Sequence, residues 1–369
     1  MDEDWQTLLS FFPHDWQEIA WDTGALKGLR KNKSPEDLLR TLLIHVGCGY
    51  SLRETALRAR KAELADLSDV ALMKRLRKSR EWLRLMCVSL FQSRGVALSG
   101  EGTFQVRAFD ATTVKEPGKT GSLWRLHYSV CLPSLSCDFF RLTETKGKGT
   151  GESFKQFPIR AGDYVLGDRG YSTAEGIEHV ARGGGYVTVR VNTSSLPLYQ
   201  LRGGAFDLLG EVTALQQPGA IKAWEVEVCS RSAALKGRLC VIRKSQEAIK
   251  IAQENIRKEA SRKGRDGKPE TFEYAKFVIL FTTFPRAIFP ADHVLQWYRT
   301  RWQVELVFKR FKSLAQIGHL PKYDDDSSKA WLYGKLLVAL LIEKMVDHAV
   351  SISPWGYRLE EPSPTQCLA

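Results

Sequence analysis

The chain has 369 residues, 43% of them hydrophobic and 26% charged, which excludes a disordered or fibrous protein and leaves room for two or three domains. Its net charge of +12 favours a polyanionic partner, most simply nucleic acid, although an unrelated basic enzyme can carry the same excess. Seven scattered cysteines without metal-ligand spacing, an acidic start without a signal-peptide pattern, and a longest apolar run (residues 336–342) too short for a bilayer predict a cytoplasmic protein with no membrane partner.

Residues 1–100 predict a helical domain. Ser34, followed by proline and two acids, is a helix start, and Ser51 begins a capping box after a Gly-Cys-Gly stop. Ser68 begins a third helix over residues 70–91 that is rich in lysine and arginine. Two helices joined by a tight glycine turn are compatible with a DNA-binding helix-turn-helix, but a helical bundle with a solvated basic face has the same pattern.

Residues 101–195 predict the first part of an α/β core. The pattern changes here to alternation of period two, and two strands, residues 104–110 and 164–168, end in Asp110 and Asp168. Three further strands and one helix are predicted at residues 124–131, 138–145, 186–191 and 173–182. Three strands followed by alternating helix and strand indicate a mixed sheet flanked by helices.

The rest of the chain interrupts this core and then completes it. Residues 196–270 contain short strands and then a basic helix, which predicts an inserted β-rich subdomain. Residues 271–350 form the remainder of the core, with an apolar strand at 272–283 and helical sequence from 290 onward. Residues 351–369, which are rich in proline and serine, are expected to be a loose tail.

The most informative segment is residues 297–312, which predicts a helix with one chemically mixed stripe. At about 100° per residue, five side chains fall within an arc of roughly 80°. They are Tyr298, Arg301, Glu305, Lys309 and Lys312, which leaves Trp302, Leu306 and Phe308 to face the protein. Such a stripe can hold a metal ion on its acid and phosphates on its cations. On spacing alone, a salt-bridged surface helix is the simpler interpretation.

Two strand-end acids favour the first interpretation. Asp110 and Asp168 both follow apolar strands, and ligands of open α/β sheets gather where chains leave the sheet. With Glu305 from a helix, they would supply an oxygen-only site for Mg²⁺ or Mn²⁺, with two ions expected. Two such ions can activate a water or a DNA 3′-hydroxyl and stabilise the leaving oxygen of a displacement at phosphorus.

With these residues in view, the sequence resembles a known family. Four residues match, in type and spacing, the Y-R-E-K signature of bacterial insertion-sequence transposases of family four, which have a DDE catalytic triad: Tyr298, Arg301, Glu305 and Lys312. Residues 109–113 and 166–171 are similar to the segments around the first two acids of that triad. The likeness covers about residues 30–345 and includes the β-rich insertion.

The resemblance implies a ribonuclease-H-like core in which Asp110, Asp168 and Glu305 are catalytic metal ligands. It implies that phosphates of the DNA end are held by Tyr298, Arg301 and Lys312, and the stripe adds Lys309 to them. It further implies binding of the element's inverted repeats, strand cleavage and transfer into target DNA by a homodimer on paired ends, at the bacterial nucleoid. A hairpin intermediate is left open. Trp224 in the insertion is an aromatic clamp for a flipped base or, more simply, a core residue.

Two alternatives remain open. Little sequence follows the helix predicted at residues 331–350, where the family has further helices for dimerisation, and this slightly favours a metal-dependent nuclease of the same fold that no longer transposes. The other alternative is a non-catalytic DNA-binding protein. Its basic helices would suffice, but isolated carboxylates beside phosphates repel DNA unless a metal is present.

Several basic side chains on or near the predicted strands have more than one interpretation. Arg125, Arg169, Arg190 and Arg243 can contact DNA, or they can pair with acids. His127 is expected to be packed in the protein rather than to bind metal, because no other histidine or cysteine stands at metal-ligand spacing.

Overall fold

The computed structural model describes residues 2–29, 34–93, 106–115, 123–132, 137–147, 149–264, 266, 268–302, 305, 309 and 324–351. Contacts divide the chain into two compact units. The helical unit comprises Met1–Val96, Val114–Leu123 and Phe308–Ala369, and the strand unit comprises Ala97–Thr113 and Trp124–Val307. No helix in these described segments is long and apolar enough to cross a membrane.

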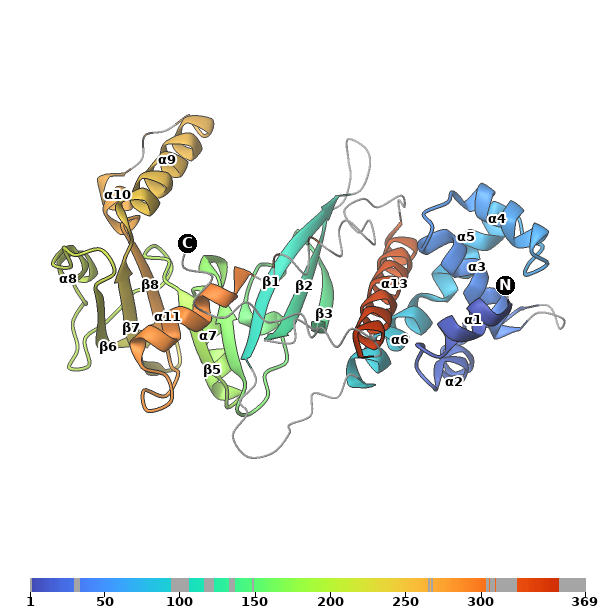
Figure 1. The fold of residues 1–369 in the computed structure, drawn as a ribbon, viewed down its shortest axis with the longest axis horizontal. Coiled ribbons are helices and arrows are strands. Elements are labelled where there is room, and N and C mark those ends of the chain that lie inside the picture. Colours follow the sequence, from blue (N-terminus) through green and yellow to red (C-terminus); the bar gives the residue numbers. More distant parts are fainter. Residues whose placement is uncertain are drawn as a thin grey trace. The chain divides into compact units, whose positions relative to one another are not determined.

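In the described part of the chain, the helical unit combines helices from both ends of the sequence (Figure 1). They are α1 (Asp2–Leu9), α2 (Trp16–Asp22), α3 (Pro35–Val46), α4 (Leu52–Lys61), α5 (Asp69–Lys78), α6 (Arg80–Ser93) and α13 (Asp325–Ser351). The hydroxyls of Ser34, Ser51 and Ser68 cap α3, α4 and α5 by accepting hydrogen bonds from backbone N–H groups. The helix starts predicted from the sequence are confirmed.

The single basic helix predicted over residues 70–91 is wrong, because the chain turns at Ser79 between α5 and α6. The Ser79 backbone N–H donates to the carbonyls of Arg75 at 3.0 Å and Leu76 at 3.2 Å. The Ser79 hydroxyl also donates to the Arg75 carbonyl, at 2.9 Å. A shared N–H of this kind tightens and ends the last turn of a helix.

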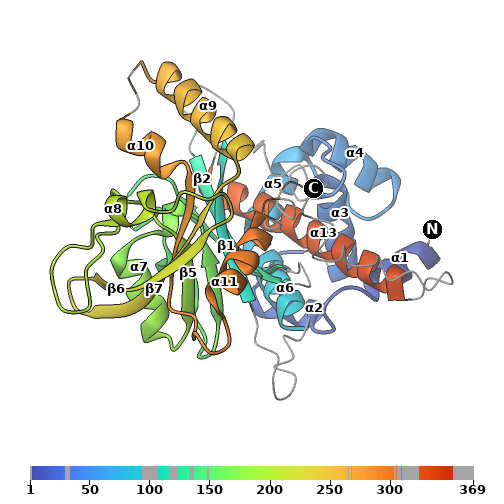
Figure 2. The ribbon, with the colours of Figure 1, turned by 60° about the vertical axis from the view of Figure 1, so that its left-hand side comes forward.

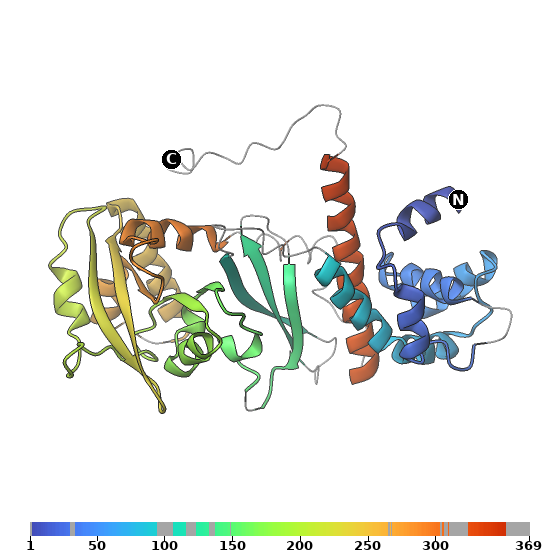
Figure 3. The same cartoon turned by 90° about the horizontal axis from the view of Figure 1, so that it is seen from below.

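α13 packs in the helical unit, whereas the sequence suggested that residues 271–350 belong to the core. Its apolar side chains, among them Trp331 and Leu340, are buried, and the helix contacts α3, α5 and α6 (Figures 1 and 3). A Cβ built on Gly334 would lie only 2.9 Å from Val46 of α3, so the glycine permits a close approach. The unit boundary therefore differs from the expected one, since local sequence cannot show which partner covers an apolar helix face. Of the predicted tail, only Ser351 is described, and it ends α13.

The strand unit is built on an eight-stranded sheet in the order β3-β2-β1-β4-β5-β8-β7-β6 (Figure 2). The strands are β1 (Val106–Lys115), β2 (Leu123–Leu132), β3 (Cys137–Glu144), β4 (Tyr164–Gly167), β5 (Tyr186–Arg190), β6 (Ile221–Cys229), β7 (Ala234–Arg243) and β8 (Phe277–Thr282). β1, β4 and β5 are parallel, and α7 (Ala174–Arg182) makes the crossover from β4 to β5. The predicted mixed α/β fold is confirmed and is compatible with a ribonuclease-H-like core.

The β-rich stretch extends this sheet and forms no separate sheet within the described residues. β6 pairs with β7, and β7 pairs with β8, all antiparallel. The predicted basic helix is α9 (Gln246–Arg262), which follows α8 (Leu208–Thr213) and precedes α10 (Pro269–Tyr274). The strand predicted at 272–283 begins later than expected. Its first residues belong to α10, because Pro269 at the first turn of α10 starts a helix there. α9 and α10 extend from the end of β7 and β8 (Figures 1 and 2).

The core beside β1 and β4 is aromatic. The rings of Phe109 and Phe157 stack with centroids 4.1 Å apart, and Phe154 contacts both Phe109 and Tyr171. All four side chains are buried. Truncating a phenylalanine in such a core typically costs about 3–5 kcal/mol. This packing therefore fixes the backbone on which the strand-end residues stand.

Candidate active site

Asp110 and Asp168 lie at equivalent positions on neighbouring parallel strands. β1 and β4 pair in register, and the last pair is Ala108 opposite Leu166. Two residues further along each strand the side chain returns to the same face, which brings the two aspartates side by side. β4 ends just before Asp168, as predicted. β1 continues to Lys115, so the prediction that this strand ends at Asp110 is wrong.

The Asp110 carboxylate is partly buried and held by two hydrogen bonds. Its Oδ1 accepts from the backbone N–H of Ala111 at 2.8 Å, and its Oδ2 accepts from the Tyr128 hydroxyl at 3.1 Å. Burial raises the pKa of Asp110 to about 6; the Ala111 N–H opposes this rise, and the carboxylate of Asp168 adds to it. Two acids this close favour a cation between them.

Asp168 caps the short turn η2 (Arg169–Tyr171), and its Oδ1 accepts from the Gly170 N–H at 2.7 Å. A Cβ built on Gly170 would clash with Oε2 of Glu152 and would lie 3.1 Å from Oδ1 of Asp168. The glycine therefore leaves space that the two carboxylates share. Glu152 was not identified from the sequence, because it follows no predicted strand and stands in a glycine-rich segment without a periodic pattern.

Tyr171 is buried next to the acids. Its hydroxyl has no hydrogen-bond partner among the residues that the structure describes. The pKa of the Tyr171 phenol is raised well above its usual range, first by burial and then by three carboxylates. They belong to Asp110, Glu152 and Asp168. The Tyr171 ring thus packs on Phe154 in the aromatic core, while its hydroxyl lies near a group of acids.

Glu305 forms the salt bridge expected from the simpler interpretation of its helix. Its Oε1 lies 3.0 Å from Nη2 of Arg301, and the Glu305 side chain is 50% exposed. Burial lowers the pKa of Arg301, but Tyr298, Glu305 and then the two aspartates outweigh burial and raise it. The Arg301 guanidinium is therefore a positive charge that interacts with all three predicted acids.

The three acids do not surround a common point. Within the described residues, no group of three or more histidine, cysteine, aspartate or glutamate side chains is close enough to hold a metal ion. The donor set itself is suitable, because Asp110, Asp168 and Glu305 offer only carboxylate oxygens, the ligands that Mg²⁺ prefers.

The predicted stripe on residues 297–312 is not one continuous helix. α11 (Ala291–Thr300) ends before Arg301, which is in a turn, and Trp302 is again helical. Tyr298 stands on α11 and is half-buried, and burial raises its pKa. Trp302 was expected to face the protein but is 51% exposed.

Of the remaining members of the stripe, the structure describes Lys309. Lys309 is helical and exposed. Lys312 lies outside the described residues, as do Leu306 and Phe308.

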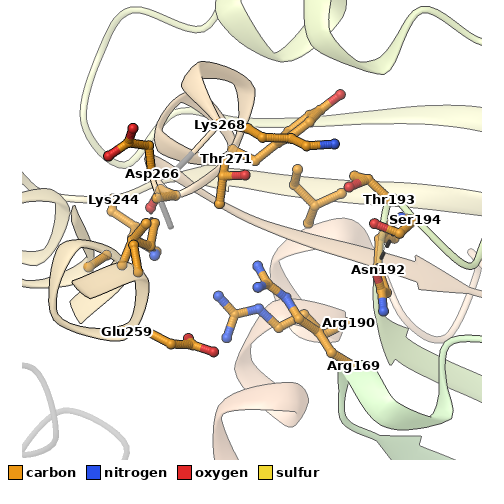
Figure 4. Close-up of a pocket in the computed structure, with 17 residues that line it drawn as sticks. Arg169, Arg190, Asn192, Thr193, Ser194, Lys244, Glu259, Asp266, Lys268 and Thr271 are labelled. Atoms are coloured by element: carbon orange, nitrogen blue, oxygen red, sulfur yellow. Dashed lines mark hydrogen bonds between the residues drawn. The ribbon is translucent and has the colours of Figure 1, made fainter. Parts of the chain in front are cut away.

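A cavity of about 540 Å³ lies between β5, α9 and α10, and its lining begins at Arg169, the residue after Asp168. Figure 4 shows the guanidinium groups of Arg169 and Arg190 pointing into it. Burial and these two arginines lower the pKa of Lys244, a further lining residue, to about 8. Burial and Arg190 also lower the pKa of Arg169. Neighbouring cations that lower one another's pKa repel each other, and an anion bound between them relieves this repulsion. Lys244 was not identified from the sequence.

Four other candidates have structural partners. Arg125 and Arg243 donate to backbone carbonyls at 2.6 Å and 2.9 Å. His127 is fully buried, which confirms the expectation that it is packed. Nε1 of Trp224 donates to Oε2 of Glu211 at 2.8 Å, and the partly buried ring packs near Phe206, which supports its interpretation as a core residue.

Comparison with known proteins identifies a family and several relatives. Residues 101–341 match the family described as Transposase DDE domain. The chain is 30% identical over 362 residues to InsL, a protein for insertion sequence element IS186A of Escherichia coli strain K12, covering 95% of this chain and 96% of that protein. The transposase for insertion sequence element IS421 of Escherichia coli is 30% identical over 363 residues, with the same coverage. The transposase for insertion sequence element IS231B of Bacillus thuringiensis subsp. berliner is 22% identical over 373 residues, covering 89% of this chain and 76% of that protein.

Proposed function

We propose, from the premise that this chain belongs to the DDE transposase family, that Asp110, Asp168 and Glu305 are its catalytic acids and hold divalent metal ions. The chain is an enzyme of DNA transposition, and the family cleaves DNA strands and transfers them. DDE transposase domains depend on a divalent metal, generally Mg²⁺. A pair of ions, Mg²⁺ or Mn²⁺, is part of the proposal.

The observation that carries the proposal is the register of β1 and β4. It gives Asp110 and Asp168 equivalent positions on adjacent parallel strands, where their carboxylates act on each other. Hydrogen bonds from Ala111, Tyr128 and Gly170 hold the two carboxylates in place. A bound divalent ion would neutralise these acids and stabilise the charge that develops at the phosphorus under attack.

In this proposal Glu305 and Arg301 separate, and each then binds a different partner. The salt bridge between them lies partly in solvent, and exposed pairs of this kind contribute only about 0–1 kcal/mol. Little free energy is therefore needed to separate them. Glu305 then joins the two aspartates, and the freed guanidinium of Arg301 binds a phosphate of the DNA, for which its planar geometry is suited.

The DNA end is held by one phenol and several cationic side chains. We assign phosphate contacts to Tyr298, Arg301, Lys309 and Lys312, and the cations of the cavity continue this basic surface. Backbone phosphates supply most of the affinity in such complexes.

The rest of the proposal concerns the whole molecule. The helical unit, mainly residues 1–100, recognises the inverted repeats of the element. Two copies of the chain act together on paired ends and join them to target DNA. They work in the bacterial cytoplasm, at the nucleoid.

Cleavage of DNA that carries the element's own ends tests the catalytic acids. Asp110→Asn, Asp168→Asn and Glu305→Gln should each lower the rate of Mg²⁺-dependent strand cleavage by at least about 100-fold. Glu225→Gln, an exposed acid on the outermost strand β6, is the matched control and should cleave at the wild-type rate.

Added target DNA separates transfer from cleavage, since a transposase yields a joined product and a nuclease yields only cut ends. Cleavage by the Glu305→Gln variant at the wild-type rate would remove this residue from the catalytic set.

A further inference from the structure

Glu152 is held beside Asp168 by an anchored loop. The side-chain amide of Gln156, itself buried, donates to the carbonyl of Gly149, and Nη1 of Arg125 donates to the carbonyl of Thr150 at 2.6 Å. Phe154, two residues after Glu152, is fully buried in the aromatic core. The backbone of Glu152 is thus fixed on both sides by contacts to the core, and its position does not depend on the flexibility of a glycine-rich loop.

The Glu152 carboxylate shares the space above Gly170 with Asp168. Oε2 of Glu152 lies close enough to clash with a Cβ at residue 170, and Oδ1 of Asp168 would lie 3.1 Å from that Cβ. The glycine leaves this space open to the two carboxylates. Within the described residues no cation forms an ion pair with Glu152, although Arg125 acts on it from a distance. Two carboxylates without a paired cation repel each other.

The Tyr171 hydroxyl is an independent sign that these acids surround a ligand. Tyr171 is fully buried, and its hydroxyl has no hydrogen-bond partner within the part of the chain that the structure describes. The charges of three carboxylates act on it, those of Asp110, Glu152 and Asp168, so it lies near these acids. A buried hydroxyl without a partner is rare, and a bound ion or its hydration is one of the few explanations.

We propose that Glu152 is a further acid of this metal site and shares a divalent cation with Asp168, the acid that it lies beside. The inference rests on the proposed function, to which it adds a fourth carboxylate that the Y-R-E-K and DDE motifs do not contain. Glu152 belongs to the loop before η1 (Phe154–Gln156), whereas Glu305 belongs to the segment after α11. The strand unit then binds a cation before Glu305 leaves Arg301.

Equilibrium binding of Tb³⁺ to the full-length chain, without DNA, tests this inference. Tb³⁺ binds carboxylate oxygens and emits when a nearby aromatic ring is excited, and Mn²⁺ added as a competitor gives the affinity for a divalent ion. Glu152→Gln should weaken Mn²⁺ binding by about tenfold, in the range seen when a supporting group of a metal site is lost. Asp168→Asn is the positive reference, and Glu225→Gln is the matched control. Tyr171→Phe should lower the emission at saturation, because this ring faces the site.

The outcomes separate this inference from the proposed function. An unchanged affinity in Glu152→Gln, with weakened binding in Asp168→Asn, overturns the role of Glu152 and leaves the other acids in place. Unchanged affinity in both variants overturns the inference together with the proposed metal ligands. Thermal melting shows whether Glu152→Gln is folded. If it is not, Glu152→Asp, which keeps the charge but withdraws the oxygens, must bind Mn²⁺ more weakly than the wild type, and equal binding overturns the inference.

Discussion

At the scale of single residues, the strand unit concentrates charge in a few buried side chains. Arg107 is fully buried, with Nε 2.8 Å from Oδ2 of Asp138 and Nη1 2.7 Å from Oδ2 of Asp163. Removing one partner of such a pair typically costs about 3–5 kcal/mol, because the other charge stays buried without compensation. Arg107 stands on β1, three residues before Asp110, so these ion pairs also fix the strand that presents this acid.

His127 makes the protein less stable in acid. Burial, and then the charges of Arg125 and Arg141, lower its pKa to about 4. An unfolded histidine has a pKa of about 6.5, so the unfolded chain binds the proton more readily between these two values. Stability is therefore fully present above about pH 6.5 and is lost as the pH falls toward 4. We expect a loss of about 3 kcal/mol through this residue.

Urea unfolding at several pH values in this range measures that loss. His127→Gln cannot take up the proton and should lose less stability on acidification than the wild type. His293→Gln alters a half-exposed histidine on α11 and should follow the wild type. Parallel pH dependence of His127→Gln and the wild type would contradict the lowered pKa.

The two aspartates could be found from the sequence, whereas Glu152 could not. Asp110 and Asp168 each follow an apolar alternating run, which is a local pattern. Their adjacency depends on strand register, and the place of Glu152 depends on a missing side chain at Gly170. Both are long-range properties that no local pattern encodes.

At the scale of elements, helix starts were predictable and two helix ends were not. Ser34, Ser51 and Ser68 signal starts through their own side chains, which accept the first free N–H groups. The ends at Lys78 and Thr300 carry neither glycine nor proline. The end at Lys78 arises from the hydrogen bonds that Ser79 donates to Arg75 and Leu76, and helical periodicity does not reveal these bonds.

Asp324 stabilises the start of α13. Its Oδ1 accepts from the backbone N–H of Ser327 at 3.0 Å, and its Oδ2 lies 2.8 Å from Nη2 of Arg77. Burial raises the pKa of Asp324, but hydrogen bonds from Ser327 and Arg77 outweigh burial and lower it to about 2. We expect Asp324→Ala to lower the free energy of unfolding by about 1–2 kcal/mol at neutral pH, as the loss of a helix cap does.

The pH dependence of this effect has a defined sign. An unfolded aspartate has a pKa of about 3.9, so the contribution of Asp324 is present above that value and disappears as the pH falls toward 2. Thermal unfolding followed by helical circular dichroism should show the difference between Asp324→Ala and the wild type at neutral pH and its decrease in acid. Asp326→Ala removes only an exposed ion pair with Arg80 and should change stability by less than about 1 kcal/mol. Equal effects of both variants would argue against a capping role.

At the scale of the whole molecule, the class of fold was predictable and the division into units was not. Alternation in residues 101–195 indicated a mixed sheet, which the structure has. No sequence pattern indicated that β6 and β7 extend that sheet, or that α13 packs on α3 and α6 and not in the core. Both arrangements depend on contacts between apolar surfaces that lie far apart in the sequence.

The charge of the whole chain predicts DNA binding that weakens steeply with salt. With a net charge of +12, affinity for end DNA should fall linearly with the logarithm of salt concentration, because each neutralised phosphate releases counterions. Arg190→Gln removes one cation of the basic cavity and should reduce the slope by about 0.9. Fluorescence anisotropy of labelled end DNA over a series of KCl concentrations measures both quantities.

Lys222→Gln is the control for this measurement. Lys222 lies on β6, outside the lining of the cavity, and already pairs with Glu211 at 3.2 Å. Its removal should leave the slope near that of the wild type. A slope that falls equally in both variants would show that the cavity has no special part in binding phosphate.

The place of α13 also sets an order for the synthesis of the protein. A ribosome releases α3, α5 and α6 early, but α13, which covers part of them, comes after every strand of the sheet. Until then Val46 and the apolar residues around it lack their cover, and nascent surfaces of this kind are what chaperones bind. The helical unit is therefore completed only after the segments that carry Asp110, Asp168 and Glu305 have been made.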